Sequence, residues 1–234
     1  MNPANLSVRL GRLFSPGAVV ATLREPGDPQ LLLPEEAAHL GRAVPKRRQE
    51  FAAGRLCARR ALAEFGMPDF PIRAAQDRQP IWPDSMAGSI THTAGFCAAA
   101  VAERRRIQAL GLDSEVIGDV KAELWPHICL PGEIAWIQSL PAAAQVLAAT
   151  LIFSAKEAFY KCQFPLVRDP LGFHDVRIEA PTWDASDGIF MVHPTRRVAI
   201  SAYVSLPLHG RYLFHENLVT TGMDFTPPNP RSGA

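Results

Sequence analysis

The sequence predicts an α+β fold, because helical segments are followed by a cluster of short strands twice along the chain. The first succession has helical signals from residue 34 to residue 65 and strand signals from residue 89 to residue 112. The second has a long helical signal over Ala142–Gln163 and alternating strand signals up to Phe214. With 234 residues, the chain is long enough for one large domain or two small ones, each with a buried core.

The elements of the first half are delimited by proline and by hydrophobic periodicity. The first 30 residues are weakly patterned apart from an expected strand at Val19–Leu23. A helix is expected to begin at Pro34, because two glutamates follow in its first turn. A second helix is expected from Pro45 to about Phe65, where apolar residues recur at helical spacing.

Three short strands are expected to complete this half. Residues 67–88, rich in Pro and Gly, predict an extended connection that leads into them. Ser89–His92 and Phe96–Val101 flank a short turn, and Arg106–Leu112 forms the third strand.

The second half is expected to begin with short helical pieces after Glu115. A long helix over Ala142–Gln163 is expected to end before Pro165, because proline has no N–H to continue the ladder. Alternating residues then predict an antiparallel sheet from the segments Asp175–Ala180, Gly188–Val192, Val198–Leu206 and Gly210–Phe214. The proline-rich end, residues 221–234, is expected to be a flexible tail.

Bulk composition is that of a folded globular protein, with 47% apolar and 20% charged residues. A net charge of +1 gives no overall attraction to nucleic acid or to a membrane surface. No uninterrupted apolar run approaches the roughly 18 residues of a membrane span. Four cysteines, without zinc-site spacing, predict reduced and mostly buried thiols: Cys57, Cys97, Cys129 and Cys162. We therefore expect a soluble cytoplasmic protein.

Two carboxylates one residue apart, Asp113 and Glu115, follow an apolar run. On an extended strand both side chains lie on one face, where they repel each other unless a cation lies between them. Such a pair is a weak signal, and a solvated strand end is the ordinary alternative. No Lys or Arg adjoins the pair, which favours a metal site, and oxygen ligands suit Mg²⁺ better than Zn²⁺.

A third carboxylate, Glu157, stands between Lys156 and Lys161 on the long predicted helix. Because Glu157 and Lys161 are four residues apart, they could form a surface ion pair worth only about 0.3–0.5 kcal/mol. The apolar residues Phe153 and Phe159 argue against a simply solvated helix. Glu157 could then be a metal ligand, a base for a serine hydroxyl, or both, and the two lysines could neutralise phosphate.

Basic residues and a histidine form two further candidate elements. Seven basic residues and one acidic residue, Glu50, lie between Arg42 and Arg60, and this local field can attract a polyphosphate ligand or an acidic protein. A solvated helix face is the alternative, which we prefer for Arg42, Arg48 and Arg60. Small residues surround His92 and would let a ligand approach the backbone, although a lone histidine is more often structural.

Together these segments resemble the phosphopantetheinyl transferases of the Sfp/EntD type. The resemblance covers roughly residues 34–180 and rests on motifs in family order: Arg47–Arg59, Gly88–His92, Gly111–Glu115 and Phe153–Lys161. It implies a pseudo-dimer of two similar α/β halves, each with helices packed on a small, mainly antiparallel sheet. The halves would be residues 1–108 and 109–220, followed by the tail, 221–234.

The resemblance also implies the reaction and its residues. Such an enzyme moves the 4′-phosphopantetheine arm of coenzyme A to a serine of an apo acyl or peptidyl carrier protein, with Mg²⁺ as the metal and Mn²⁺ as the alternative. From charge and composition we expect no nucleic acid or membrane partner, and we expect a monomer. The implied catalytic residues are Glu157, His92 and Lys161, and the implied metal ligands are Asp113, Glu115 and Glu157. The implied coenzyme A contacts are Arg47, Arg55, Arg78, Thr91, His92, Thr93, Asp113, Lys156 and Lys161.

The chain departs from the family pattern near Ala74–Asp77, where many relatives carry a lysine; Arg73 and Arg78 are candidates to replace it. Leu171–Asp175 also echoes the family, as a wall of the pantetheine channel. Two other functions stay open at this point. One is a metal-dependent hydrolase of coenzyme A or nucleotide pyrophosphates. The other is a nucleic-acid-binding module that uses the basic helix, although aromatic residues do not alternate with its arginines as stacking platforms would.

Overall fold

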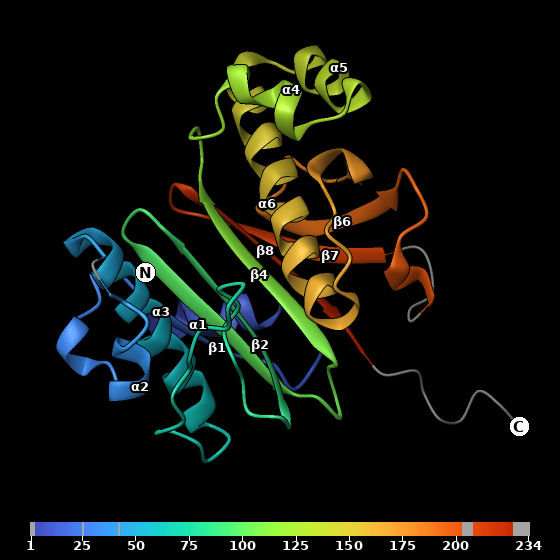
Figure 1. The fold of residues 1–234 in the computed structure, drawn as a ribbon. Helices are drawn as coiled ribbons and strands as arrows, with labels where there is room; N and C mark the ends of the chain where they lie inside the picture. The colour runs from blue at the N-terminus through green and yellow to red at the C-terminus, as the bar shows by residue number, and fades with distance from the viewer. Residues whose placement is uncertain (1–2, 25, 42, 203–207, 227–234) are drawn as a thin grey trace, which may run out of the picture.

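Two antiparallel sheets, each covered by a long helix, form the protein (Figure 1). The computed structural model describes residues 3–24, 26–41, 43–202 and 208–226. The three-stranded sheet has the order β1-β3-β2, and the five-stranded sheet has the order β4-β8-β7-β6-β5. The strands are β1 (Val19–Leu23), β2 (Met86–Thr93), β3 (Phe96–Glu103), β4 (Ala109–Val116), β5 (Val176–Glu179), β6 (Asp187–Pro194), β7 (Leu208–His215) and β8 (Leu218–Phe225). The helices are α1 (Pro3–Gly11), α2 (Pro34–Ala37), α3 (Pro45–Ala63), α4 (Trp125–Ile128), α5 (Pro131–Ser139) and α6 (Ala142–Val167). The predicted α+β class is confirmed.

Helix α3 covers the three-stranded sheet with a surface of small residues. Its buried face includes Ala53, Cys57 and Ala61, which pack with Ala99 and Val101 of β3 in one apolar cluster. Small side chains on both surfaces let the helix lie close to the sheet. The helix predicted from Pro45 is confirmed, and it ends two residues before Phe65.

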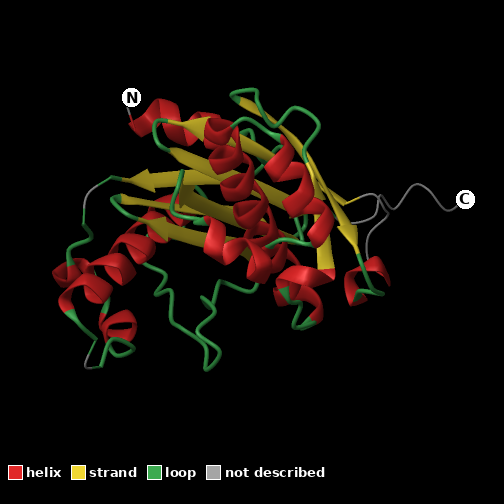
Figure 2. Ribbon diagram, turned by 90° about the horizontal axis from the view of Figure 1, so that it is seen from above, coloured by secondary structure: helices red, strands yellow, loops and turns green. Residues whose placement is uncertain are grey.

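Helix α6 lies across β4 and β8 of the five-stranded sheet, and Figure 2 shows the helices stacked against the strands. A Cβ at Gly111 would come within 1.9 Å of the carbonyl oxygen of Ala158, so only glycine permits this crossing. Asp113 and Glu115 follow at strand spacing on the same face as Gly111, which directs both carboxylates toward α6.

The two halves meet where β2 runs beside β4. Hydroxyl groups of β2 accept hydrogen bonds from the free backbone edge of β4: Leu112 N–H donates to Ser89 Oγ (3.0 Å) and Ser114 N–H donates to Thr91 Oγ1 (2.9 Å). Helix α1 adds Leu6 and other apolar side chains to a core that includes residues of both sheets. The halves are therefore joined by buried polar and apolar contacts.

Several sequence predictions at element ends are wrong. Helix α6 continues through Pro165 to Val167, where Arg168 adopts a left-handed conformation (φ 55°) as the C-cap. The strand predicted at Arg106–Leu112 is displaced to Ala109–Val116, which brings Asp113 and Glu115 inside the strand.

Three more differences concern the terminal regions. The weakly patterned first residues contain helix α1. Strand β8 pairs with β4 as far as Phe225, so a tail beginning at residue 221 is wrong, and residues 227–234 lie outside the described part. Ala199–Ala202 forms a 3₁₀ helix instead of part of the strand predicted at Val198–Leu206. The last part of that predicted strand, residues 203–206, lies outside the described residues.

Within the described ranges, α6 alone has the length and hydropathy of a membrane-spanning helix. Of its most apolar 18-residue stretch, 56% is buried inside the protein. That burial is what the central helix of a packed core shows, and length and composition by themselves are weak grounds for a span. The four cysteines are free and buried, as predicted.

Candidate active site

A cleft of about 280 Å³ opens between the two halves. The first half contributes residues from α3, from β2 and from the loop before β2, and the second half contributes α6. Its polar and charged walls include Arg55, Arg78, His92, Tyr160 and Lys161. A cleft lined by several cations from different elements is suited to an anionic ligand.

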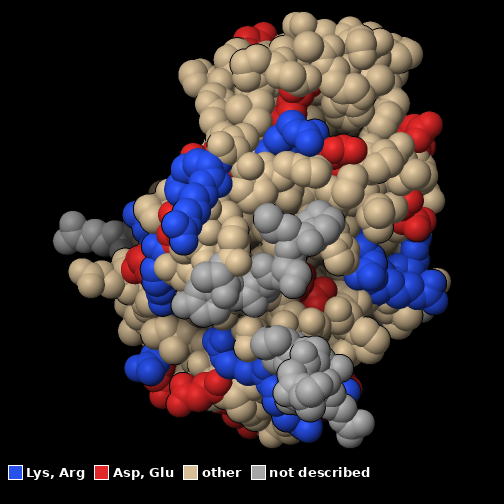
Figure 3. Space-filling model, turned by 90° about the vertical axis from the view of Figure 1, so that its right-hand side faces the viewer, with Lys and Arg blue, Asp and Glu red and all other residues tan. Residues whose placement is uncertain are grey.

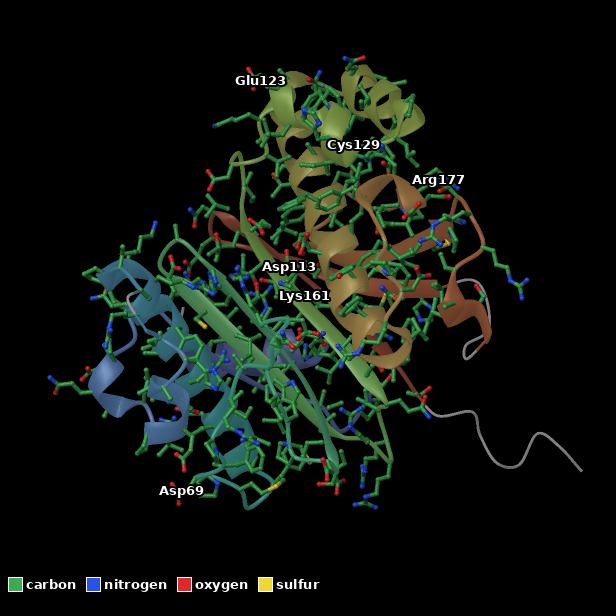
Figure 4. The ribbon with its side chains drawn as sticks, in the orientation of Figure 1. Asp69, Asp113, Glu123, Cys129, Lys161 and Arg177 are labelled. Atoms are coloured by element: carbon green, nitrogen blue, oxygen red, sulfur yellow. The ribbon has the colours of Figure 1, made fainter. Side chains whose placement is uncertain are left out.

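Asp113 and Lys161 connect β4 to α6 beside this cleft. Lys161 Nζ donates to Asp113 Oδ1 at 2.6 Å, and Figure 4 shows the two side chains meeting between strand and helix. Asp113 is 2% exposed, and its other oxygen, Oδ2, is buried without a hydrogen-bond partner. A buried carboxylate oxygen normally has a partner, so this one is free to ligate a cation.

Glu115 and Glu157 lie close enough to Asp113 for the three charges to repel one another. Burial, then the charge of Asp113 and that of Glu157, raise the pKa of Glu115 to about 8, although Lys161 opposes them. Burial also raises the pKa of Glu157, with Asp113 adding to the effect and Lys161 opposing it. The three predicted metal ligands thus influence one another electrostatically. Among the described residues, however, no three Asp, Glu, His or Cys side chains are grouped closely enough to hold a metal ion as they stand.

Lys161 is the cation at the centre of this acidic group. Burial lowers the pKa of Lys161, but Asp113, Glu157 and Glu115 together outweigh burial and raise it. The amine therefore stays charged and holds a positive centre between the carboxylates and the cleft.

His92, at the end of β2, contacts the basic helix. Arg47 Nη1 lies 3.1 Å from His92 Nε2 and 3.6 Å from a carboxylate oxygen of Glu50. Partial burial lowers the pKa of His92, and the nearby cations Arg47 and Lys161 lower it further, while Glu50 opposes them. Because Arg47 is half exposed, its guanidinium can turn toward a ligand.

Arg55 is held in the cleft wall more firmly than Arg47. Its Nε donates to the carbonyl of Ile72 at 2.9 Å, and its guanidinium lies 3.9 Å from the centre of the Phe51 ring. Burial lowers the pKa of Arg55 to about 10, against the opposing charge of Glu36. These two contacts hold the guanidinium of Arg55 in the cleft wall before any ligand arrives.

Two family models match the chain on either side of the β3–β4 connection. The 4′-phosphopantetheinyl transferase N-terminal domain matches residues 35–102, and the 4′-phosphopantetheinyl transferase superfamily matches residues 109–212. The chain is 38% identical over 210 residues to the 4′-phosphopantetheinyl transferase Svp of Streptomyces mobaraensis. This alignment covers 87% of this chain and 82% of Svp. The chain belongs to the 4′-phosphopantetheinyl transferases.

Two further relatives match shorter parts. The 4′-phosphopantetheinyl transferase PptT of Mycobacterium tuberculosis is 40% identical over 159 residues, covering 64% of this chain and 66% of PptT. Enterobactin synthase component D of Escherichia coli is 38% identical over 143 residues, covering 60% and 66%. The transferase therefore moves the phosphopantetheine arm of coenzyme A to carrier proteins, and the hydrolase alternative finds no support among its relatives.

Lys156 is buried and does not line the cleft that Lys161 lines. The Lys156 side chain is 1% exposed, and its ammonium donates to Ile128 O (2.8 Å), Glu133 Oε2 (2.7 Å) and Phe173 O (3.0 Å). All three donors of the lysine are satisfied by the protein. Lys156 therefore links α6 to α4, α5 and the segment after α6. It also lines a cavity beside Glu157, and its contact with coenzyme A stays a prediction.

Thr91 and Thr93 also differ from the prediction. The Thr91 side chain is 2% exposed, and its hydroxyl accepts the Ser114 N–H between the halves. Thr91 therefore has a structural contact, and neither Thr91 nor Thr93 is among the residues that line the cleft. Thr93 is half-buried at the end of β2, on the Thr91 side of the strand and therefore opposite His92.

Sequence reasoning missed several cleft residues of the transferase. Trp82 lies under β2 at Gly88, where a Cβ would come within 2.4 Å of the indole ring. Tyr160 and Phe164 line the second wall and stack at 5.1 Å between ring centres. Their spacing of four residues on α6 was a usable signal, since such residues share a helix face.

A second cavity, of about 340 Å³, adjoins the carboxylates of the transferase. Glu157 and Tyr160 of α6 form one side, and Pro170 to Phe173 form the other. The segment Leu171–Phe173, which echoed the family in the sequence, thus lines a cavity next to Glu157. Tyr160 lines both cavities, so the two adjoin each other at this residue.

Proposed function

We propose that this transferase works with Mg²⁺ held by Asp113, Glu115 and Glu157, and that Lys161, His92, Arg47 and Arg55 bind the phosphates of coenzyme A. The proposal is carried by one observation, the group of three mutually repelling carboxylates around Lys161 at the edge of a cationic cleft. Arg78, which also lines the cleft, is the candidate for the basic residue missing near Ala74.

The carboxylates fit a divalent cation. Asp113 Oδ2 is buried without a partner, and the pKa of Glu115 is raised because burial and neighbouring negative charges disfavour ionisation. A cation between them would relieve both costs. When bound, Mg²⁺ would neutralise charge on the pyrophosphate, and an all-oxygen donor set suits it. Mn²⁺ is compatible with the same ligands.

Each residue has a task in the transfer. The carrier serine oxygen forms a bond to the β-phosphorus of coenzyme A, and the bond from that phosphorus to the bridging oxygen breaks. Glu157 accepts the serine proton, while adenosine 3′,5′-bisphosphate leaves with its charge balanced by Lys161 and His92. The pantetheine arm would lie in the second cavity, between Tyr160 and Leu171–Phe173.

The carrier protein would approach over α4 and α5. Between Glu123 and Lys156, Glu133 is the only Asp, Glu, Lys or Arg, and it is buried, so this part of the molecule shows few charged side chains (Figure 3). A low-charge surface with exposed Leu124 suits the core of a protein interface. Apo acyl or peptidyl carriers of fatty acid, polyketide or siderophore assembly in the cytoplasm are the proposed partners. We propose a monomer, because residues of one chain complete the cleft.

The test is transfer itself, measured with a panel of purified apo carriers. The protein is incubated with coenzyme A and Mg²⁺, and each carrier is weighed by intact mass spectrometry. A gain equal to the phosphopantetheine arm on some carriers, lost with chelator and restored by Mg²⁺, is expected. Transfer at full rate in excess chelator would contradict the metal proposal and leave the transferase activity intact.

A further inference from the structure

Asp77 and Arg168 form an ion pair across the mouth of the cleft. Arg168 Nη1 donates to Asp77 Oδ2 at 2.7 Å, and the two residues are 91 positions apart in the chain. Asp77 belongs to the loop that lines the first wall. Arg168 caps α6 and lies 5.5 Å from the ring centre of Phe164, which lines the second wall. The guanidinium therefore sits between two cleft-lining side chains from opposite halves.

The backbone on both sides of this pair is unusual. Among the described residues, only three other than glycine have positive φ, and two of them are Arg168 (φ 55°) and Arg78 (φ 69°), the neighbour of Asp77. Left-handed backbone costs free energy in residues other than glycine, and such conformations cluster at ligand-binding sites. At Arg168 this conformation is the C-cap of α6, and at Arg78 it belongs to the loop that lines the cleft.

The pair itself is weakly held. The Arg168 side chain is 60% exposed and that of Asp77 is 43% exposed, and solvent-exposed ion pairs add little stability. A ligand phosphate can therefore replace the carboxylate at small cost, because guanidinium binds phosphate with the same forked geometry. The carboxylate of Asp77 also accepts hydrogen bonds from the backbone N–H of Gln79 (3.2 Å) and from the side-chain amide of Gln79 (2.6 Å). These bonds keep Asp77 in place when Arg168 turns away.

The position along α6 indicates which phosphate it would meet. Arg168 is seven residues beyond Lys161, or about 10 Å further along the helix at 1.5 Å per residue. Phe164, which stacks on Tyr160, presents its aromatic ring to the cleft in that interval. If Lys161 meets the pyrophosphate, as the proposed function holds, the remote anion of the same substrate is the phosphate on its ribose.

We propose that Arg168 is a further substrate-binding residue, which exchanges its contact with Asp77 for the ribose 3′-phosphate of coenzyme A. The inference rests on the proposed function, in which coenzyme A occupies this cleft. Asp77 then acts as a place-holder that keeps the guanidinium at the mouth of the cleft before the substrate enters.

The test compares Arg168→Gln, Asp77→Asn and a matched control, Arg177→Gln. Arg177 is also an exposed arginine in an ion pair, with Glu179 at 3.2 Å, but it is on β5 and does not line the cleft. Binding of coenzyme A and of dephospho-coenzyme A, which lacks the 3′-phosphate, is measured by calorimetry, and carrier loading is measured in parallel at saturating coenzyme A.

Arg168→Gln is expected to weaken coenzyme A binding roughly three- to tenfold, less than a buried charged hydrogen bond because the site is open to solvent. Its effect on dephospho-coenzyme A should be less than twofold. Asp77→Asn should leave coenzyme A affinity unchanged or improve it, and Arg177→Gln should change neither ligand.

The inference would be overturned if Arg168→Gln weakened the binding of both ligands equally or of neither ligand. It would also be overturned if Asp77→Asn weakened the binding of coenzyme A. The last outcome would mean that the ion pair only holds the halves together. A wild-type protein that loads no carrier would instead overturn the proposed function.

Discussion

Asp113 on β4 and Lys161 on α6 are joined at 2.6 Å, and one oxygen of the same aspartate has no protein partner. The contact fixes the Asp113 carboxylate against the helix and leaves its second oxygen, Oδ2, available to a ligand. Because Gly111 lets the helix approach the strand, the arrangement depends on backbone packing as much as on the two charges. The site is thus assembled where the long helix crosses the first strand of its sheet.

Glu115 should make stability depend on pH when no divalent cation is present. Its pKa in the folded protein is raised to about 8 from an ordinary value of 4.5. A raised carboxyl pKa means that the folded state holds the proton more strongly than the unfolded state. The stability that Glu115 contributes is therefore full below its ordinary pKa of 4.5 and is lost as the pH rises through about 8.

Thermal melts in chelator from pH 5 to 9 should therefore show a falling Tm. Glu115→Gln should flatten this fall, because glutamine does not titrate. Mg²⁺ should raise the Tm of the wild type most at high pH, where the carboxylate is ionised. A pH profile identical in wild type and Glu115→Gln would show that Glu115 is not the source of the dependence.

The sequence carried enough information to place Asp113 and Glu115 on one strand face and the long helices on their sheets. It could not separate Lys156 from Lys161, because both flank Glu157 in one motif. The two lysines are five residues apart, which turns their side chains about 140° from each other around a helix. Only the fold brings Glu133 of α5 to Lys156 and so reveals its structural contact.

Physical reasons also explain why the sequence did not predict strand β8 and the last turn of α6. Strand β8 includes Thr220, Thr221 and Gly222, which have weak individual signals, but it is buried between β4 and β7. A proline normally ends a helix because it has no backbone N–H to donate. Pro165 nevertheless lies in the last turn of α6, which continues to Val167. In both cases tertiary packing outweighs local preference.

Gly111→Ala tests the crossing of α6 over β4. The new methyl would meet the Ala158 carbonyl oxygen at 1.9 Å, so the helix must shift, at a cost of about 1–3 kcal/mol or more. Tm and transfer rate should fall together, because the shift also parts Lys161 from Asp113. Gly132→Ala is the matched control, since no atom lies within 4 Å of its added methyl. Equal Tm values for the two variants would contradict the packing argument.

Lys156→Met should damage the fold, whereas Lys161→Met should damage the reaction. Removing the Lys156 ammonium leaves Glu133 buried and unpaired, at a cost of about 3–5 kcal/mol in unfolding free energy. Adding Glu133→Gln should recover part of this loss, because the uncompensated charge is gone. Denaturant unfolding measures the first effect and carrier loading the second. A Lys156→Met protein as stable as the wild type would contradict this structural role of Lys156.

Glu157→Gln separates the two tasks proposed for this carboxylate. Glutamine keeps the shape and one oxygen but cannot accept the serine proton. If Glu157 is the base, coenzyme A and Mg²⁺ should bind nearly as in the wild type by calorimetry. Turnover should fall about 10²–10⁴-fold, the usual contribution of a positioned base.

The pH dependence of that turnover gives an independent check. Burial and Asp113 raise the pKa of Glu157, so in the absence of cations the carboxylate ionises at a higher pH than usual, and Lys161 opposes this. Mg²⁺ between the carboxylates should move the rising limb of the wild-type rate to lower pH, because a cation favours the ionised base. Glu157→Gln should lose that limb. Loss of Mg²⁺ binding in Glu157→Gln would instead make Glu157 chiefly a ligand. Unchanged binding with unchanged turnover would contradict both proposed tasks of Glu157.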